Sequence, residues 1–360
     1  MGDFFWRVPR LRICSCPGRY IRYNLYSFLG GGEAAAQKTK RISATIAHAN
    51  SASLSILNNE IKITKFEYLK LNLNLMKITV QKNIIIHNPE TRDFLADAYY
   101  PEGAEKLPLV IFVHGYKGYK DWGAWDLMAE KFAEAGFFFV KFNFSHNGTT
   151  VEKPTEFGDL EAFGNNNFTK EMSDFDALLE SFSEYPGIDF TKIAVIGHSR
   201  GGGISLIKAY EDERIRVLVT LAGVSNFNYR FPSGDRLENW KNNGVMYSEN
   251  QRTHQQMPHY YQFYEDFKQN EERITIQYCA QHLEKPVLII QGTEDEAVKD
   301  KEAFLLHEWC KKSELYIIEG ANHTFGAKEP WMEQNLPADL ANAVAETIRF
   351  FKLNFLKKFF

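Results

Sequence analysis

The sequence predicts an α/β fold with a mostly parallel central sheet of about eight strands, helices on both faces of the sheet, and an inserted cap. From residue 108 onward, short apolar runs that suit buried strands alternate with stretches of helical pattern, which is typical of a parallel sheet. One aromatic-rich stretch, residues 223–284, interrupts this alternation and is too long for an ordinary connection. With 360 residues, 44% of them hydrophobic, the chain is long enough for one large domain of this kind.

We expect the body of the chain, residues 76–360, to begin with an antiparallel hairpin. Residues 78–86 and 94–100 are rich in strand formers, and a turn sequence at 88–91 joins them. The elements predicted after the hairpin are a central strand at 108–113, a helix at 121–135, a strand at 137–144, a helix at 169–184, a strand at 193–196 followed by a helix, a strand at 216–221, the cap with a closing helix at 271–283, a strand at 287–290, a helix at 301–310, a strand at 315–318 and a last helix from 337. We expect the last helix to fray over residues 350–360.

Residues 1–75 differ from the body in charge and texture. They carry 11 Lys and Arg against 4 Asp and Glu, whereas residues 76–360 carry 31 against 42. Their Arg-rich, Ser-rich composition resembles an organelle transit peptide, but they lack the apolar run of a secretory signal. We therefore expect a poorly ordered basic extension, with partial alternation at 66–75 as its one strand pattern.

Bulk composition also limits the partners and the compartment. An acidic body argues against nucleic acid as a partner, and no stretch approaches the ~18 unbroken apolar residues of a membrane span. Four scattered cysteines are too few for a disulfide framework, which predicts a reducing compartment such as the cytoplasm. Cys14 and Cys16 have no second pair nearby, so we expect no metal site there.

The chemistry-bearing stretch is Gly197-His198-Ser199-Arg200-Gly201, between an apolar β-branched run and a helix-compatible segment. A sharp strand-to-helix turn at this point would hold Ser199 in a strained conformation, with its hydroxyl above the sheet and free to attack a carbonyl. The residues two before and two after such a serine must be small, and both are glycine. This pattern predicts a nucleophile at Ser199.

A serine nucleophile needs a base and an acid that orients the base. His323 directly follows the last predicted strand and fits the base better than its rivals: His198 adjoins the serine, His282 and His307 lie on helices, and His48 and His87 precede the core. Asp295, after the preceding strand, is the expected acid, with Glu294 and Glu296 as neighbouring alternatives. All three candidates follow parallel strands, whose carboxyl ends form the edge where such sheets assemble sites.

The oxyanion of an acyl-transfer reaction needs two backbone N–H donors. We expect one from Arg200, at the start of the helix, and one from Tyr116, in the loop after the central strand. Substrate contacts are expected at His114, Lys117, Trp240 and Tyr247, with packing or a solvated rim as the alternative for each.

The His-Gly loop at 114–115, Gly-His-Ser-Arg-Gly, Gly-Thr-Glu-Asp at 292–295 and Ala-Asn-His at 321–323 resemble, in order and spacing, the α/β-hydrolase fold superfamily. Within it, residues 77–355 most resemble esterases of the dienelactone hydrolase and cinnamoyl-esterase type. The resemblance implies a triad of Ser199, Asp295 and His323, an oxyanion hole at Tyr116 and Arg200, and no cofactor. Residues 142–148 depart from feruloyl-type members, which often carry an aspartate-containing loop there.

The resulting hypothesis is a serine hydrolase that cleaves carboxylic esters of small to medium size through an acyl-enzyme. A peptidase or an acyltransferase would use the same triad, and a non-catalytic binding protein of this fold is the contrasting alternative. Nucleotide and metal motifs are missing, because no Gly-Lys-Ser/Thr follows the glycines at 201–203 and no His-Glu-x-x-His occurs.

Overall fold

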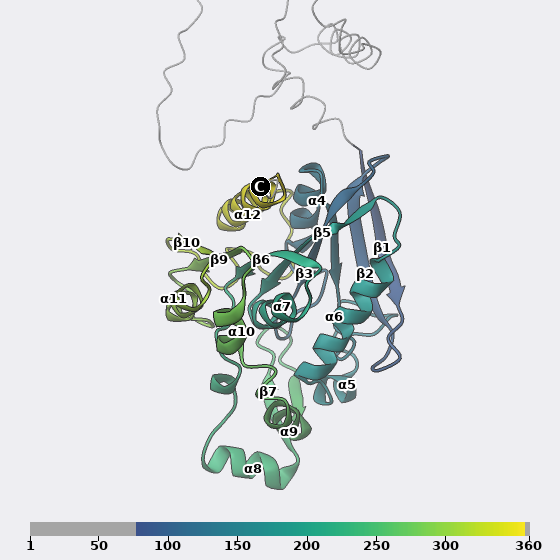
Figure 1. The fold of residues 1–360 in the computed structure, drawn as a ribbon. Helices are drawn as coiled ribbons and strands as arrows, with labels where there is room; N and C mark the ends of the chain where they lie inside the picture. The colour runs from purple at the N-terminus through teal and green to yellow at the C-terminus, as the bar shows by residue number, and fades with distance from the viewer. Residues whose placement is uncertain (1–76, 357–360) are drawn as a thin grey trace, which may run out of the picture. The chain divides into compact units, whose positions relative to one another are not determined.

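A computed structural model describes residues 77–356 of the chain (Figure 1). The expected basic extension at 1–75, its strand pattern at 66–75 and the cysteine pair at its start lie outside the described residues.

The main feature is one eight-stranded sheet in the order β1-β2-β4-β3-β5-β6-β9-β10. β1 and β2 form the predicted antiparallel hairpin, β2 is also antiparallel to β4, and every later pairing is parallel. The strands are β1 (Ile78–Ile86), β2 (Phe94–Pro101), β3 (Leu107–Val113), β4 (Phe138–Phe142), β5 (Ile188–His198), β6 (Ile215–Leu221), β9 (Val287–Gly292) and β10 (Ser313–Ile318). The mostly parallel sheet expected from the apolar runs is confirmed.

The central strand β3 shows why these runs become buried strands. Leu109 and Ile111 point into one apolar cluster, whereas Val110 and Phe112 point into another, and all four are at most 1% exposed. A strand alternates its side chains between the two faces of a sheet, so a run that is apolar at every position requires cover on both.

Helices cover both faces. α6 (Phe168–Phe182), α7 (Arg200–Glu211), α10 (Ile276–His282) and α11 (Asp300–Trp309) contribute to one cluster, and α4 (Trp125–Glu134) and α12 (Ala338–Leu356) to the other. Figure 1 shows α4 and α12 close together, away from α8 and α9.

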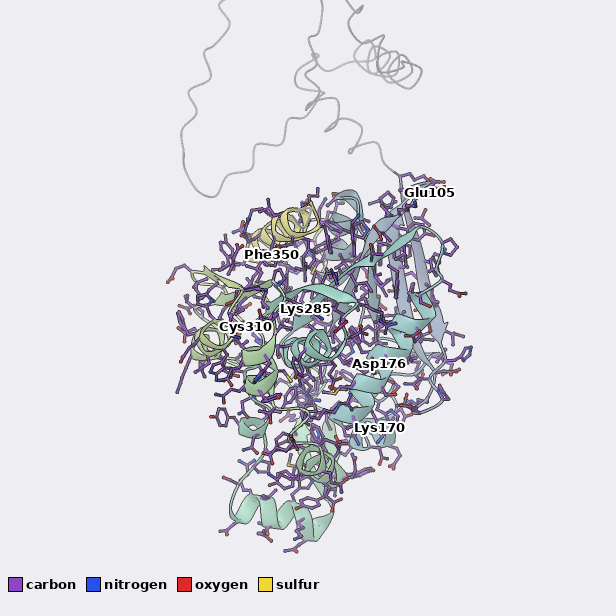
Figure 2. The ribbon with its side chains drawn as sticks, viewed as in Figure 1. Glu105, Lys170, Asp176, Lys285, Cys310 and Phe350 are labelled. Atoms are coloured by element: carbon purple, nitrogen blue, oxygen red, sulfur yellow. The ribbon has the colours of Figure 1, made fainter. Side chains whose placement is uncertain are left out.

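The C-terminal helix extends further than the sequence predicts. α12 continues to Leu356, and Phe350 and Phe351 on it are buried; Figure 2 labels Phe350. The expected fraying is wrong for residues 350–356, because the ring of Phe351 packs against Phe132 and Phe137 on the same face of the sheet.

Residues 223–284, called the insert below, separate β6 from β9. They form η1 (Asn228–Arg230), α8 (Asp235–Asn243), an antiparallel hairpin of β7 (Val245–Glu249) and β8 (Gln256–Tyr260), α9 (Gln262–Gln269) and α10. The helix expected at 271–283 begins only at Ile276, because residues 271–274 form the turn after α9. The hairpin and the short α5 (Leu160–Gly164) were not predicted.

None of the helices within residues 77–356 combines the length and the apolar character needed to cross a bilayer.

Candidate active site

The turn between β5 and α7 is strained at Ser199, whose backbone angles are φ 56° and ψ −121°. Non-glycine residues rarely adopt such angles, and this strain, which costs about 1–3 kcal/mol, persists only where the surroundings impose it. The two flanking glycines provide those surroundings. A Cβ on Gly197 would lie 2.3 Å from the carbonyl oxygen of Gly201, and a Cβ on Gly201 would lie 2.3 Å from that of Val113. The small residues inferred from the sequence are therefore required by close backbone contacts.

Backbone hydrogen bonds hold Ser199 in place and leave its hydroxyl unused. The Ser199 N–H donates to the carbonyl of Leu221 at 2.9 Å, and its carbonyl accepts from Val224 N–H at 3.2 Å. The side chain does not cap α7, and within residues 77–356 its Oγ forms no hydrogen bond. The hydroxyl at this strained position is thus not committed to a structural role.

His323 and Asp295 are joined by a hydrogen bond of 2.8 Å between Nδ1 and Oδ2. The Asp295 side chain is fully buried, and its Oδ1 accepts the N–H groups of Ala297 and Val298 at 2.8 Å each. Gln291 donates to Oδ2 at 3.0 Å. Burial opposes ionisation of this carboxyl, but the hydrogen bond and charge interaction with His323, together with the other donors, hold the pKa of Asp295 below its usual range.

The two glutamates that the sequence left as alternatives lie on the surface. Glu294 and Glu296 are both exposed, while Asp295 between them is 2% exposed. Burial therefore distinguishes Asp295 from the two glutamates, which their spacing in the sequence could not do.

His198, the neighbour of Ser199, brings the serine turn into contact with the His323 loop. Its Nε2 lies 2.9 Å from the carbonyl oxygen of His323, and the two rings are 4.8 Å apart. Ser199 Oγ and the His323 ring are not hydrogen-bonded in this structure. Such bonds are often long before a substrate binds, so the missing bond does not exclude a catalytic pair.

The loop after β3 packs directly against the serine. A Cβ on Gly115 would lie 2.8 Å from the Cβ of Ser199, so only glycine allows this approach. Lys117 has a positive φ of 54°, and Gly118 N–H donates to the Gly115 carbonyl at 3.1 Å, which closes a tight turn around Tyr116. The turn therefore places the Tyr116 segment beside Ser199 and the start of α7.

The four expected substrate contacts have different surroundings. His114 is buried, with Nδ1 2.8 Å from the Gly115 carbonyl and Nε2 accepting Phe144 N–H at 3.2 Å; burial lowers its pKa to about 4. Trp240 is 1% exposed and donates its indole N–H to the His259 carbonyl. Both side chains serve internal packing and hydrogen bonding, which favours the packing alternative for His114 and Trp240. Lys117 is partly exposed and Tyr247 is 60% exposed.

Sequence reasoning missed the surroundings of the Arg200 side chain. Its guanidinium carbon lies 4.5 Å from the ring centre of Tyr116 and 5.3 Å from that of Phe263, which is a cation–π geometry. Nη1 lies 3.2 Å from Oε1 of Glu171, a buried carboxyl whose pKa is raised by burial. No local pattern links these residues, since they come from α6, α7, α9 and the loop after β3.

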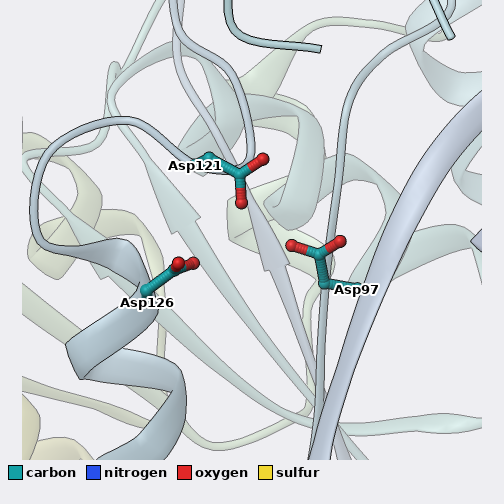
Figure 3. Close-up of side chains that lie close together, drawn as sticks. All are labelled: Asp97, Asp121 and Asp126. Carbon is teal, nitrogen blue, oxygen red and sulfur yellow. The ribbon is translucent and has the colours of Figure 1, made fainter. Parts of the chain in front are cut away.

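One group of side chains has the donor types of a metal site. Single carboxylate oxygens of Asp97, Asp121 and Asp126 lie within 4.8 Å of one another (Figure 3). The ammonium groups of three lysines occupy this space: Lys141 Nζ is 2.8 Å from Asp97 and 2.6 Å from the other two aspartates, and Lys82 and Lys120 make similar contacts. Three ammonium groups balance three carboxylates, so we assign the group as a salt-bridge network.

Comparison with known proteins identifies a family for this chain and solved structures that share its fold. A family model described as the prolyl oligopeptidase family (Peptidase_S9) matches residues 127–338. Among curated proteins, the uncharacterized protein PA2218 of Pseudomonas aeruginosa is 27% identical over 127 residues, which is 35% of this chain and 32% of that protein. The chain thus spans about a third of that relative.

Two solved esterase structures share the fold. One, described as ferulic acid bound to Est1E from Butyrivibrio proteoclasticus, has a TM-score of 0.59 and 18% identity, covering 76% of this chain and 100% of that one. The other, the esterase domain of a Rhodothermus marinus protein, has a TM-score of 0.51 and 16% identity, covering 77% and 100%. Together with the family match, they confirm the predicted α/β-hydrolase fold.

Proposed function

This chain belongs to the prolyl oligopeptidase family, and we propose that it is a serine hydrolase that cleaves carboxylic esters of small to medium size. The observation that carries the proposal is the buried Asp295 hydrogen-bonded to His323, at the same edge of the sheet as the strained Ser199. This combination supplies an acid, a base and an uncommitted hydroxyl, which is the set that acyl transfer requires.

In the proposed mechanism, Ser199 Oγ attacks the ester carbonyl while Nε2 of His323 takes the hydroxyl proton. Asp295 holds Nδ1 and stabilises the imidazolium that forms. The oxyanion accepts hydrogen bonds from the backbone N–H groups of Tyr116 and Arg200. The tetrahedral intermediate then collapses as His323 protonates the leaving alcohol. Water then attacks the acyl-enzyme with His323 again as base, which releases the acid and restores Ser199.

The test is the effect of Ser199→Ala on hydrolysis of p-nitrophenyl acyl esters. We expect kcat to fall by about 10⁶, to the background set by the remaining site, with no loss of folding. Ser181→Ala is the matched control, since Ser181 is exposed on α6 and bonds only to its own helix. A fluorophosphonate probe should label the wild type at Ser199 and leave Ser199→Ala unlabelled. Normal hydrolysis by Ser199→Ala would remove the serine from the mechanism, and an unlabelled, inactive wild type would favour a non-catalytic binding protein.

The family match favours a peptidase as the second candidate. The same three residues would cleave an amide if the site protonated an amine leaving group as well as an alcohol. A matched pair with one acyl group, its p-nitrophenyl ester and its p-nitroanilide, separates the two. We expect turnover of the ester alone, and a comparable kcat/KM on the anilide would assign peptidase activity instead.

A further inference from the structure

Tyr116, whose backbone is the proposed oxyanion donor, has its side chain held by the insert. The inference below rests on the proposed function. We propose that His259 and Ser248, on the β7–β8 hairpin, are positioning residues that fix the Tyr116 loop and so complete the oxyanion hole.

Three polar groups meet at the tip of the Tyr116 ring. The Tyr116 hydroxyl lies 2.6 Å from Nε2 of His259 and 2.7 Å from Oγ of Ser248, and these two atoms are 3.2 Å apart. Tyr116 lies more than 100 residues away in sequence from both Ser248 and His259, whereas these two residues lie on the same hairpin. The hydrogens available in this triangle of polar groups make two hydrogen bonds to the Tyr116 hydroxyl, which fix it in position and orientation more tightly than one bond does.

A second contact ties the same loop to the same hairpin. Lys117 Nζ donates to the carbonyl oxygen of Glu249 at 2.6 Å, one residue along from Ser248. Two consecutive residues of the loop are therefore attached to two consecutive residues of β7. This double attachment restrains the backbone between Gly115 and Gly118, including the Tyr116 N–H.

The ring of Tyr116 also links the two proposed oxyanion donors. The Arg200 guanidinium stacks on it at 4.5 Å, and the His259 ring lies 5.5 Å away on the insert side. Tyr116 thus lies between the start of α7 and the hairpin, in contact with both.

The hairpin is itself well anchored, so it can act as a support. The His259 carbonyl accepts the buried indole N–H of Trp240 at 2.7 Å, which attaches β8 to α8. Tyr260 packs so closely on α5 that a Cβ on Gly164 would lie 2.9 Å from its ring, and its hydroxyl donates to Glu161. An anchored hairpin can keep the backbone N–H of Tyr116 pointing at the reacting oxygen, which a loop without such support would not do.

The imidazole of His259 has the right charge for this role. Burial, followed by the nearby positive charges of Arg200 and Lys117, lowers the pKa of His259 to about 3. The ring is therefore neutral at neutral pH, and its Nε2 can accept a hydrogen bond from the Tyr116 hydroxyl while the Tyr116 oxygen accepts one from Ser248.

The experiment compares Tyr116→Phe, Ser248→Ala and the pair His259→Gln and His259→Leu. Tyr116→Phe keeps the ring on Arg200 but removes the hydroxyl. We expect kcat for a p-nitrophenyl ester to fall about 10- to 100-fold in Tyr116→Phe, Ser248→Ala and His259→Leu, with KM within about twofold, because a displaced donor weakens only the transition state. Affinity for an alkylboronic acid, which forms a tetrahedral adduct with the serine, should fall by the same factor. Gln can also bond to the hydroxyl, so His259→Gln should retain more activity than His259→Leu.

Two exposed residues of the insert provide matched controls. Tyr229→Phe removes a hydroxyl from a side chain that is 72% exposed, and His254→Gln changes an exposed imidazole in the turn of the same hairpin. Both should keep wild-type kcat.

The outcomes separate the two proposals. If the wild type is neither active nor labelled by fluorophosphonate, the proposed function fails and this inference fails with it. If the wild type is active, but Tyr116→Phe and His259→Leu keep normal kcat and boronate affinity, the inference alone is wrong. Lower thermal stability with normal kcat would show that the triangle only holds the insert in place. A rise in KM with unchanged kcat would assign these residues to substrate binding and also overturn the inference.

Discussion

At the scale of single residues, the strained backbone of Ser199 and the buried carboxylate of Asp295 each depend on a few close contacts. Ser199 keeps its positive φ because the backbone of β3, β5 and α7 converges on it, and Gly197 and Gly201 are where those backbones touch. Asp295 is distinguished from its glutamate neighbours by burial and by two backbone donors. Both features concern one residue and its immediate contacts.

Gly201→Ala tests the packing under the serine. Its added Cβ would lie 2.3 Å from the Val113 carbonyl oxygen, and backbone cannot yield as a flexible side chain can. We expect the free energy of unfolding to fall by about 1–3 kcal/mol, as for other overpacked sites, and the proposed esterase activity to fall with it. Gly158→Ala is the control, because no atom lies within 4 Å of its Cβ position. Urea denaturation of the two variants gives the comparison, and equal stabilities would contradict the close contact.

Asp295→Asn tests the proposed role of the carboxylate in orienting His323. An amide can keep the shape of the site but favours the wrong tautomer of His323, so we expect kcat to fall by about 10⁴ with little change in KM. Glu294→Gln, one residue earlier and exposed, should be neutral. Steady-state kinetics on a p-nitrophenyl ester give kcat for both variants. A larger loss in Glu294→Gln than in Asp295→Asn would assign the orienting role to Glu294 instead.

At the scale of elements, α6 is tied to the first hairpin and to the loop after β4 through one buried carboxyl. Asp174 accepts from Thr91 Oγ1 at 2.6 Å, from Asn88 Nδ2 at 3.0 Å and from Ser145 N–H at 2.7 Å. Burial raises the pKa of Asp174 to about 6, although these hydrogen bonds act in the opposite direction. The docking of α6 should therefore depend on pH.

The sign of that dependence follows from proton binding. The folded carboxyl holds its proton up to about pH 6, whereas the unfolded one loses it near pH 3.8, so stability from this group is greatest in acid and declines as pH rises between these values. We expect the difference in unfolding free energy between wild type and Asp174→Asn to shift by about 2 kcal/mol against wild type from pH 4 to pH 7. Urea unfolding at both values measures it, with the exposed Asp235→Asn as the control. A difference that stays constant would show that Asp174 is ionised throughout.

At the scale of the whole molecule, buried charges add a second connection between elements that also share an apolar cluster. Asp97 on β2 and Lys141 on β4 are both fully buried, and their network reaches β1 through Lys82 and α4 through Asp126. Burial disfavours ionisation of Asp121 within it, but Lys141, Lys120 and Lys82 outweigh this and hold its pKa well below the usual range. Each charge is acceptable there only while its partners remain.

Lys141→Met tests this dependence. Removal of one ammonium leaves buried carboxylates with too little compensation, and we expect the free energy of unfolding to fall by about 3–5 kcal/mol. Lys131→Met on α4 removes an exposed lysine paired with Glu134, and should cost about 0–1 kcal/mol. Equal losses in chemical denaturation would show that the network contributes no more than a surface ion pair.

The sequence by itself determined the elements whose signals are local. Apolar runs predicted the strands, the glycines around Ser199 predicted the sharp turn, and the positions of Asp295 and His323 after strands predicted their meeting at one edge. These predictions held because a buried strand or a tight turn imposes its requirements on neighbouring residues in the chain.

Only the tertiary structure determined which residues of the insert are buried and which contact the Tyr116 loop. Trp240 proved to be buried, and the contacts of Tyr116 with Ser248 and His259 join residues 132 and 143 positions apart. The buried Lys–Asp network likewise links residues up to 44 positions apart. Such contacts leave no periodic trace in the sequence, because they depend on how separately formed elements pack and on which side chains then lose water.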